Sequence, residues 1–502
     1  MTDFLRLSNI SKSFGGVQAL KSVDFSIGKG EIHCLVGENG SGKSTLIKII
    51  SGNLQPDAGE IWIEDHIYKH LRSIDSINMG IQVIFQDFAL FPNLSVAENI
   101  AYSQLVEKKE KILNWKEIET IARIAIDKIK VKLDLEEQVS NLSVANQQMV
   151  AICRALTSDL RFLILDEPTS ALTKKEIDQL FLVVKDLQQK GISVMFVSHK
   201  LNEVLEIAER ITVIRDGQNV ATLPREEITN ERLIYLMTGK EITYSRYKKS
   251  INTEKKLLEV QNLSKKHNFK DVSFALHHGE IFGITGLLGS GRTELALALF
   301  GMDPADSGKI LVEGKEIQIR SVKDAVQAGI GYVPENRLEQ GLIMKKSVGE
   351  NIVTVIIKRL LGKFNLIDSK KWETTVNHWV NELEIKVVNP EVPVQTLSGG
   401  NQQRVVIAKW LSVHPKILIL DSPTVGIDIA AKSSIHKIIR DMADNGVGII
   451  FISDEIPEVV NNCNRIAIMR NGRIFKQTDT TNVTEAEIQQ LVEMSGAVSV
   501  PK

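Results

Sequence analysis

The sequence repeats itself at an interval of about 250 residues, and this repeat constrains the fold more than any other feature. VGENGSGKST, which starts at Val36, returns as TGLLGSGRTE from Thr285, an offset of 249 residues at the first glycine. LSVANQQ at Leu142 returns as LSGGNQQ at Leu397, an offset of 255. FLILDEPTSAL and FVSHKLNEV also return at 255. The 502 residues therefore hold two copies of one unit, each of ordinary domain size.

The two offsets differ by six residues, which predicts one small insertion in the second copy, between the segment around Pro334 and Leu397. Composition typical of a linker begins near Pro224 and ends with the polar run SRYKKSINTEKK. The predicted parts are a first domain, a linker and a second domain, at residues 1–240, 241–256 and 257–502.

Within each copy, apolar runs of strand length alternate with longer helical patterns. FLILDEP and ILILDSP have the composition of buried strands. This alternation predicts an α/β fold built on a largely parallel sheet. Residues 96–138 and 348–392 are richer in helix formers and have heptad-like spacing, so we expect a helical subdomain in each copy.

Charge and cysteine content exclude several classes of function. Lys and Arg (61) nearly balance Asp and Glu (62), so no large field of one sign draws the chain onto nucleic acid. Cys34, Cys153 and Cys463 lie far apart, which predicts neither disulfides nor a zinc cluster and fits a reducing cytoplasm. The N-terminus has no apolar run after a basic start, and no stretch reaches about 18 apolar residues. We therefore expect no direct membrane insertion, and membrane association only through a partner.

Residues 37–44 satisfy the pattern G-x-x-x-x-G-K-[ST] directly after the apolar run IHCLV. The glycines let backbone N–H groups close around phosphate oxygens, the following helix adds a favourable dipole, and Lys43 supplies a cation. Taken alone, the pattern could be a glycine-rich turn. The predicted nucleotide-binding residues are Phe14, Gly37, Glu38, Asn39, Gly40, Ser41, Gly42, Lys43, Ser44 and Thr45.

Two carboxylates end the predicted strand FLILD. We expect Asp166 to hold magnesium, directly or through water, and Glu167 to polarise the attacking water. An Asp-Glu pair at a strand end is also a common helix cap, but its place downstream of a complete P-loop disfavours that interpretation. His199 could contact the γ-phosphate and Gln86 could ligate metal and water, although each alone is an ordinary loop residue. The predicted catalytic residues are Glu167, His199 and Gln86, and the predicted metal ligands are Ser44, Gln86 and Asp166.

Phe14, placed before the first strand, could stack on adenine, although an isolated aromatic is more often part of a core.

LSGGNQQR from Leu397 resembles the signature sequence of ATP-binding-cassette (ABC) proteins. P-loop, Gln86, signature, LDEPTSAL and His199 follow one another in the order of that family, twice over. GLLGSGRTEL, YVPENR from Tyr332, LSGGNQQRVVIAKWL and LSVANQQ are similar to the tandem ATPases of monosaccharide importers of the ribose, galactose and xylose type.

The resemblance implies two tandem P-loop NTPase cassettes, ATP and Mg²⁺ as cofactors, and ATP hydrolysis coupled to sugar translocation. It also implies a transmembrane permease dimer, with the chain bound peripherally to it on the cytoplasmic face of the bacterial inner membrane. A periplasmic sugar-binding protein would take part indirectly.

The two copies differ at the positions that carry the chemistry. Arg292 stands for Lys43 and keeps the charge as a larger planar fork, while Glu335 replaces Gln86 and His267 lies near the place of Phe14. Ser422 replaces Glu167 and has no carboxylate, although the resemblance leads us to expect a glutamate there. Asp454 replaces His199 and brings negative charge towards a phosphate, so hydrolysis should be very slow. This degenerate second site comprises Gly286, Gly289, Gly291, Arg292, Thr293, Asp421 and Ser422.

The signatures differ in the opposite sense. The first copy has Val144 and Ala145 where two glycines would let N–H groups approach a phosphate, and the second copy keeps both glycines. Head-to-tail pairing, which the resemblance implies, would combine the first P-loop with the second signature in one complete site. The residues expected to act in trans are Leu397, Ser398, Gly399, Gly400, Asn401 and Asp428.

Two other functions compete with sugar import. A soluble tandem cassette protein acting on ribosomes or DNA would favour basic character and a long charged linker, whereas this chain has net charge −1 and a short linker. An importer of nucleosides or of a signalling sugar stays open, because a cytoplasmic ATPase does not touch the cargo.

Overall fold

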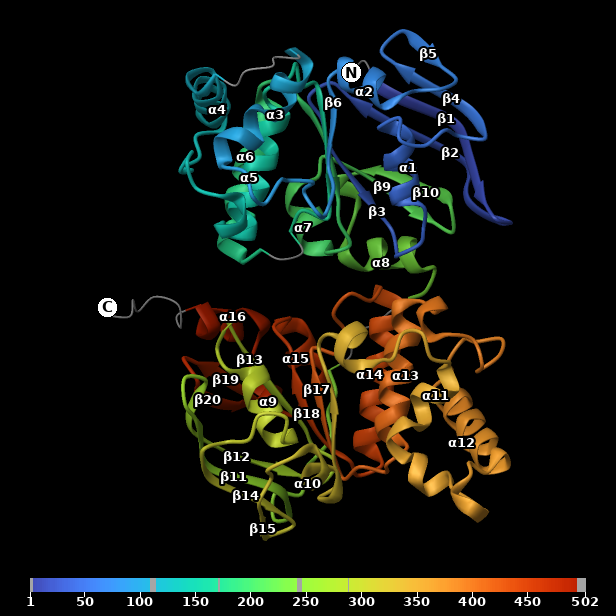
Figure 1. Cartoon of the computed structure of the whole chain (residues 1–502), viewed down its shortest axis with the longest axis vertical. Coiled ribbons are helices and arrows are strands. Elements are labelled where there is room, and N and C mark those ends of the chain that lie inside the picture. The colour runs from blue at the N-terminus through green and yellow to red at the C-terminus, as the bar shows by residue number, and fades with distance from the viewer. Residues whose placement is uncertain (1–2, 109–113, 170–171, 242–245, 288, 494–502) are drawn as a thin grey trace. The chain divides into compact units, whose positions relative to one another are not determined.

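The computed structural model describes residues 3–108, 114–169, 172–241, 246–287 and 289–493 (Figure 1). Ser170 and Ala171 of LDEPTSAL, Leu288 of GLLGSGRTEL and residues 242–245 of the predicted linker lie outside these ranges. The chain divides into two compact units, Met1–Ile242 and Thr243–Lys502, referred to below as the first and second half. Each half has a parallel-type sheet, an antiparallel sheet and a group of helices at one side.

The central sheet of the first half has six strands, which are all parallel except the edge strand β10, which is antiparallel to β9. In order across the sheet they are β10 (Gln218–Pro224), β9 (Arg210–Arg215), β3 (Ile32–Val36), β8 (Ser193–Val197), β7 (Phe162–Asp166) and β6 (Ile81–Ile84). The central strands are buried almost throughout, because a parallel sheet is covered on both faces. Their carboxyl ends meet at one edge, which brings the strand-end residues together.

A second, antiparallel sheet was not predicted from the sequence. Its strands, in the order β2-β1-β4-β5, are β2 (Val17–Gly28), β1 (Asp3–Phe14), β4 (Ala58–Ile63) and β5 (His66–Tyr68). In β1 the residues Phe4, Leu5, Leu7 and Ile10 are buried, and the residues between and after them are polar and exposed or half-buried, except for the exposed Phe14. The apolar positions are thus interrupted by polar ones, so that no continuous apolar run marks these strands in the sequence.

Helices of the first half are α1 (Lys43–Ile50), α2 (Ser73–Asn78), α3 (Val96–Lys108), α4 (Trp115–Ile129), α5 (Val144–Ala155), α6 (Lys174–Gln189), α7 (Leu201–Ile207) and α8 (Asn230–Thr238). Of these, α3, α4 and α5 pack on one another and form the helical subdomain. Ile118, Ala122 and Ile126 form part of the buried face of α4. The P-loop precedes α1, and the signature segment begins α5.

The second half repeats this plan. Its antiparallel sheet contains β12 (Phe269–His277), β11 (Lys256–Lys265), β14 (Ser307–Val312) and β15 (Lys315–Ile317). Its six-stranded sheet contains β16 (Ile330–Val333), β17 (Ile417–Asp421), β18 (Gly448–Ile452), β13 (Ile281–Gly286), β19 (Arg465–Arg470) and β20 (Arg473–Asp479). Its helices are α9 (Arg292–Phe300), α10 (Val322–Gln327), α11 (Val348–Val353), α12 (Ser369–Glu382), α13 (Gly399–Leu411), α14 (Ile429–Asp444), α15 (Ile456–Asn462) and α16 (Glu485–Glu493).

The insertion in the second half is double, which corrects the prediction of a single one. Val96 and Val348, which begin α3 and α11, are 252 residues apart, between the offsets of 249 and 255. Asn99 and Asn351 confirm this register, because each side chain bonds the loop before its own helix in the same way. Three residues are therefore added before α11 and three more after it. The P-loop and the signature, whose offsets predicted the insertion, lie on either side of both additions. Their offsets therefore give only the total of six added residues.

The linker is shorter than the composition from Pro224 onward predicts. Helix α8 occupies part of this stretch: Thr229 caps it by accepting the N–H of Arg232, and Leu233 and Met237 are buried. Residues 246–249 are attached to the second half, where Tyr247 Oη donates to Asp444 Oδ1 at 2.7 Å. Local polarity looked like a linker because the contacts that order these residues are distant in sequence.

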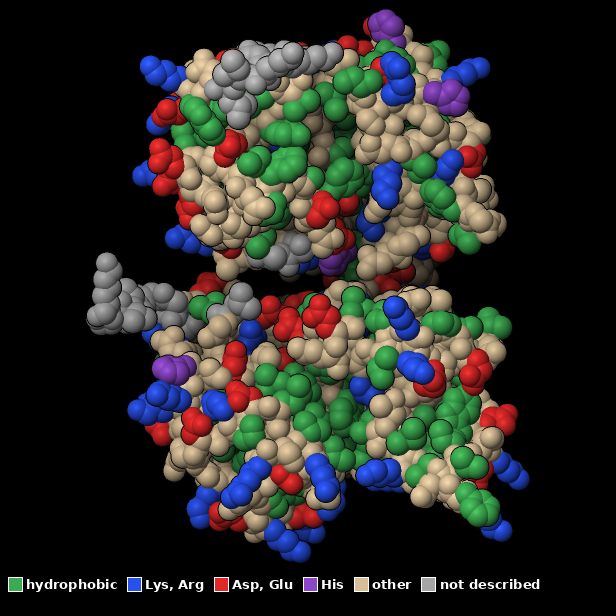
Figure 2. Space-filling model, in the orientation of Figure 1, with side chains coloured by type: hydrophobic (Ala, Val, Ile, Leu, Met, Phe, Trp, Pro, Cys, Tyr) green, Lys and Arg blue, Asp and Glu red, His purple; other side chains and the backbone are tan. Residues whose placement is uncertain are grey.

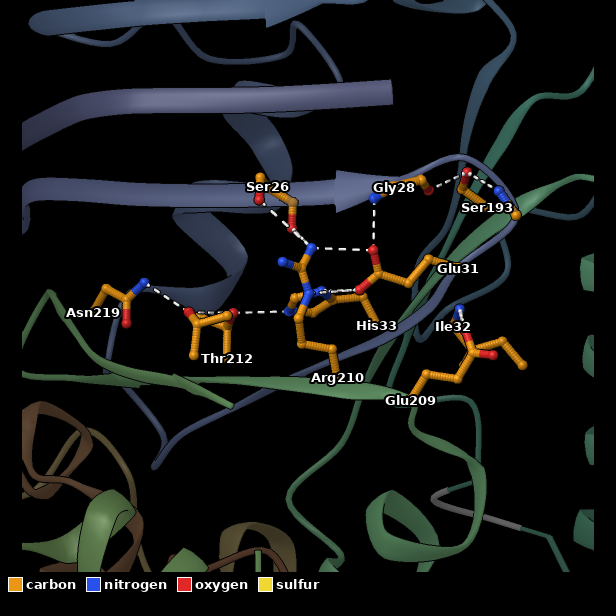
Figure 3. A network of polar contacts seen from close by, with 12 residues as sticks. Ser26, Gly28, Glu31, Ile32, His33, Ser193, Glu209, Arg210, Thr212 and Asn219 are labelled. Atoms are coloured by element: carbon orange, nitrogen blue, oxygen red, sulfur yellow. Dashed lines mark hydrogen bonds and ion pairs between the residues drawn. The ribbon is translucent and has the colours of Figure 1, made fainter. Parts of the chain in front are cut away.

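A buried polar network ties the two sheets of the first half together (Figure 3). Glu31 accepts the N–H of Gly28 at 2.6 Å and two N–H groups of Arg210, whose Nη2 also donates to Ser26 O of β2. His33 lies with Nδ1 2.8 Å from Glu31 Oε1 and Nε2 2.7 Å from the Thr212 hydroxyl. Burial works to raise the pKa of Glu31, but the hydrogen bonds from His33 and Arg210 lower it to about 2.

The second half has the same carboxylate–guanidinium pair, but its histidine stands at a different position in the sequence. Glu280 accepts Arg465 Nε at 2.7 Å, and Arg465 also donates to Ala275 O of β12. His277 Nδ1 lies 2.6 Å from Glu280, whereas the position of His33 is taken by Phe282. The carboxylate–guanidinium pair is therefore the common element that joins the sheets.

On the face drawn in Figure 2, Lys and Arg side chains are interspersed with Asp and Glu over each half. Among the described helices the structure offers no candidate for a bilayer-spanning segment.

Candidate nucleotide site

The P-loop of the first half lies between β3 and α1, and close backbone approach requires two of its glycines. A Cβ on Gly37 would stand 2.2 Å from Ile214 O, and one on Gly42 would stand 2.7 Å from Ala19 O. Gly42 also has φ +110°, which side chains with a Cβ rarely adopt. A Cβ on Gly40 would meet no atom within 4 Å, so the side of the loop at Gly40 is open.

Lys43 folds back over this loop. Its ammonium donates to Gly37 O at 2.7 Å and to Glu38 O at 3.0 Å, and only 6% of the residue is exposed. Burial lowers the pKa of Lys43, while the charges of Glu167 and Asp166 oppose that shift. In the described part of the chain the ammonium donates hydrogen bonds to two neutral carbonyls, and a phosphate oxygen would be a stronger, charged acceptor.

Three predicted residues meet at the ends of β7 and β8, which pair in parallel. Glu167 donates its N–H to Val197 O at 2.9 Å, and its Oε1 lies 3.1 Å from His199 Nδ1. The hydrogen bond with His199 lowers the pKa of Glu167 against the effect of burial, so Glu167 is a carboxylate at neutral pH. Burial and the adjacent Glu167 raise the pKa of Asp166. The structure thus gathers the carboxylate of Glu167, its partner His199 and the carboxylate of Asp166 near Lys43.

The residues present fit a magnesium ion. Ser44 is exposed in the first turn of α1, and the paired carboxylates at the end of β7 raise the pKa of Asp166, a repulsion that a divalent cation would relieve. The described residues contain no group of three or more His, Cys, Asp or Glu that could enclose a metal. Mg²⁺ suits such a site, because it usually keeps several waters and takes other ligands from bound phosphate.

Two predicted residues are not brought into this group. Gln86 is exposed beyond the end of β6, and no hydrogen bond among the described residues joins its side chain to Glu167 or Asp166. The position predicted for Phe14 is wrong: it ends the first strand rather than preceding it. Gly15 and Gly16, both at positive φ, then turn the chain into β2, and Phe14 is 48% exposed near this turn.

The two signature segments begin α5 and α13. Ser143 caps α5 by accepting the N–H of Asn146 at 3.3 Å, and Val144 is 38% exposed. In the second half, Ser398 Oγ instead accepts Asn401 Nδ2 at 3.0 Å.

The glycine Gly400 of the second signature is required by packing. A Cβ there would stand 2.6 Å from the Cβ of Ala431, the residue whose N–H is capped by Asp428 at 2.7 Å. The signature and the turn at Asp428 are therefore in direct contact.

The second site has the same strand-end backbone as the first and different side chains on it. Ser422 repeats the backbone of Glu167, with φ 45° against 48° and its N–H bonded to Ile452 O at 2.9 Å. Arg292 is 91% buried, and its Nη1 has no hydrogen-bond partner among the described residues. Burial lowers the pKa of Arg292, while Asp454 and other carboxylates oppose the shift. No residue with a carboxylate replaces Glu167 at this strand end.

The sequence analysis missed two residues of this region. Tyr332 donates its hydroxyl to Asp421 Oδ2 at 3.3 Å, and burial raises the pKa of Asp421 to about 6 despite this bond. Arg337 donates to the carbonyls of Val425 and Gly426, close to the second signature. Both residues belong to YVPENR, which the sequence analysis used for a family resemblance and for Glu335. The same motif could have pointed to Tyr332 and Arg337.

The sequence profile of the family described as ABC transporter matches residues 20–170 and 269–425. The ribose import ATP-binding protein RbsA 2 of Rhizobium meliloti is 38% identical over 98% of this chain and 96% of its own length. RbsA 3 of Rubrobacter xylanophilus is 41% identical over 94% and 95%. A protein of Agrobacterium fabrum, provisionally named for import of ribose, galactose and methyl galactoside, is 40% identical over 97% and 96%.

Solved structures match single halves. The ATP-binding cassette MJ1267 of an ABC transporter, in its ADP conformation, is 27% identical and covers 48% of this chain and 100% of its own, with a TM-score of 0.43. The profile match to both halves and the relatives along nearly the whole length agree with the two P-loops and signatures described above. The chain belongs to the ABC transporter family as one of its tandem ATP-binding proteins.

Proposed function

We propose that this chain hydrolyses ATP to drive import of a monosaccharide, of the kind its relatives are named for. One observation carries the proposal: Lys43, Asp166, Glu167 and His199 come together around one P-loop in a chain whose relatives are named import ATP-binding proteins. The assigned roles are phosphate binding for Lys43, polarisation of water for Glu167, and orientation of that carboxylate and the γ-phosphate for His199. Ser44, Gln86 and Asp166 would hold Mg²⁺, which neutralises charge on the phosphates.

The proposal includes a transmembrane permease dimer as partner and a periplasmic sugar-binding protein that delivers the cargo. The chain would sit peripherally on the cytoplasmic face of the bacterial inner membrane. The names of the relatives support this setting, since they describe import and ATP binding. Neither the sugar nor the number of copies follows from the chain itself.

We further propose that the working site is composite, built from the first-half P-loop and the second-half signature. Each half taken alone lacks a part: the first has Val144 and Ala145 in its signature, and the second has Ser422 at the catalytic position. Fusion in one chain supports pairing of unlike halves, because it holds them at an effective concentration on the order of millimolar.

Two matched substitutions test the composite site in the assembled transporter. Ser398→Arg should abolish ATP hydrolysis, because a long cation would fill the start of α13 where the phosphate must approach. Ser143→Arg makes the same change at the start of α5 and should be tolerated. Equal loss from both, or loss from Ser143→Arg alone, would exclude the composite site.

The class of cargo needs a different experiment. Import of nucleosides or of a signalling sugar is the second candidate, because nothing in an ATPase half contacts cargo. The first step is to look for a gene for a substrate-binding protein next to the gene for this chain, and thermal-shift screening of its product would then show which ligand stabilises it. A response to nucleosides without a response to sugars would replace monosaccharide import.

A further inference from the structure

Arg337 begins a five-residue π-helical turn, η3 (Arg337–Gly341), in the loop after β16. This turn lies in the first of the two insertions that distinguish the second half. Single π-turns are rare and occur frequently at functional sites. The corresponding first-half segment, from Gln86 to Ser95, contains no Lys or Arg.

The guanidinium of Arg337 joins this loop to the one after β17. Nη1 donates to Val425 O at 2.7 Å and Nη2 donates to Gly426 O at 3.1 Å. These two carbonyls are consecutive and precede Asp428, which caps α14. The fixed fork of an arginine suits two adjacent acceptors in a way that the single ammonium of lysine does not.

The same guanidinium lies against the first glycine of the second signature. A Cβ on Gly399 would stand 2.8 Å from Arg337 Nη2 and 3.2 Å from Gly426 O. The first half has Val144 at this position and no arginine in the matching loop. Because Gly399 has no side chain, the guanidinium of Arg337 can occupy this space.

The charge of Arg337 is not balanced within its surroundings. Within the described residues burial lowers the pKa of Arg337 with no opposing carboxylate, and its Nε is buried without a hydrogen-bond partner there. The guanidinium also lies at the amino end of α13, the positive end of the helix dipole. Both features favour approach of an anion to this end of the signature helix.

We propose that Arg337 is a positioning residue for ATP hydrolysis. It fixes the second-half signature to the turn at Asp428, so that both meet the nucleotide of the first half as one rigid surface. The inference rests on the composite site proposed above. Arg337 acts through its contacts with Gly399 and Gly426. The second half, which has Ser422 in place of Glu167, would in this way contribute to the rate of ATP hydrolysis.

The test is ATP turnover by the full chain in the assembled transporter. Arg337→Ala should lower kcat by about ten- to a hundredfold, because loss of fixed geometry at a reacting group is costly in rate. Affinity of the first P-loop for a fluorescent ATP analogue should stay within about twofold. Arg337→Lys should fall between, because one ammonium can hold only one of the two carbonyls.

Arg440→Ala is the matched control. Arg440 also lies in the second half and donates to Asn461 O and Asn462 Oδ1, so its removal likewise takes an arginine from backbone and amide acceptors. We expect kcat within about twofold of the unmodified chain. A loss as large as that of Arg337→Ala would show general loosening of this half and would overturn the positioning role.

A double substitution separates positioning from bulk stability. Gly399→Ala should lower kcat by pushing the guanidinium from its carbonyls, and it should add almost nothing in the Arg337→Ala background. Losses that multiply independently would overturn the proposed contact. If Ser398→Arg is tolerated, the composite site itself fails. If Ser398→Arg abolishes turnover while Arg337→Ala leaves kcat unchanged, only the role of Arg337 is lost.

Discussion

The two halves of this chain have the same backbone at the nucleotide site and different side chains on it. In each half, the residue directly after β7 or β17 has positive φ. Its N–H donates to the carbonyl of the last residue of the neighbouring strand, β8 or β18, at 2.9 Å. In the first half that residue is Glu167 with His199 beside it, and in the second it is Ser422. The comparison shows that the same strand-end backbone presents a carboxylate in the first half and a hydroxyl in the second.

The largest expected difference between the halves is in turnover. Glu167→Gln should lower ATP hydrolysis by about 10²–10³-fold or more, because it removes the carboxylate positioned for the attacking water. Ser422→Ala should change the rate by less than about twofold. The measurement is ATPase activity in the assembled transporter, and comparable losses from both variants would break the asymmetry.

The next difference is in nucleotide affinity. Lys43→Ala should weaken ATP binding to the first half by about ten- to a hundredfold, since charged hydrogen bonds contribute about 1.5–3 kcal/mol. Arg292→Ala should weaken binding to the second half less, because carboxylates such as Asp454 and Asp421 already oppose its charge. Titration with a fluorescent ATP analogue, compared with the unmodified chain, measures the affinity lost at the site that each variant alters. A larger loss from Arg292→Ala than from Lys43→Ala would reverse our assignment.

A smaller difference concerns stability and pH. The pKa of Asp421 in the folded chain is about 6, above its ordinary value of 3.8, so its ionisation opposes folding. This cost is absent below about pH 4 and complete above about pH 6. Asp421→Asn should therefore raise the unfolding temperature by a few degrees at pH 7.5 and leave it nearly unchanged at pH 4. A gain that is independent of pH would contradict the burial argument.

The smallest expected effect sharpens the comparison of the two polar networks. His33→Phe copies the residue of the second half and removes two hydrogen bonds, at a net cost of about 1 kcal/mol each, while Glu31 keeps Arg210 and Thr212 keeps Thr222 as partners. Adding Gly28→His, which copies His277, should recover part of this loss. Urea unfolding of the first half measures both, and a double variant less stable than the single one would show that the networks are not interchangeable.

Much of the site was readable from the sequence because its residues stand at the ends of continuous apolar strands. That pattern located Asp166, Glu167 and His199 and predicted the α/β class, and the repeat supplied two copies. The antiparallel sheet was missed because its buried residues alternate with exposed ones in β1 and β2. Phe14 was misplaced for the same reason.

Contacts between distant segments could not be read in this way. The bond between Tyr332 and Asp421 joins two strand ends 89 residues apart, and Arg337 reaches carbonyls 88 and 89 residues away. Neither periodicity nor spacing encodes such a pair, and only the fold brings it together. The predicted pairing of halves in trans stays a prediction.

The backbone turn at Ser422 has a consequence for the engineering of this protein. A residue with a side chain at φ 45° is strained, and here the strain persists with no carboxylate to benefit from it. The strand-end hydrogen bond from the N–H of Ser422 to Ile452 O supports this turn without a carboxylate. At this position the two halves therefore differ in the side chain and not in the backbone turn. Reintroducing a glutamate at position 422, together with the first-half residues opposite it, would start from a scaffold that already aims the side chain correctly.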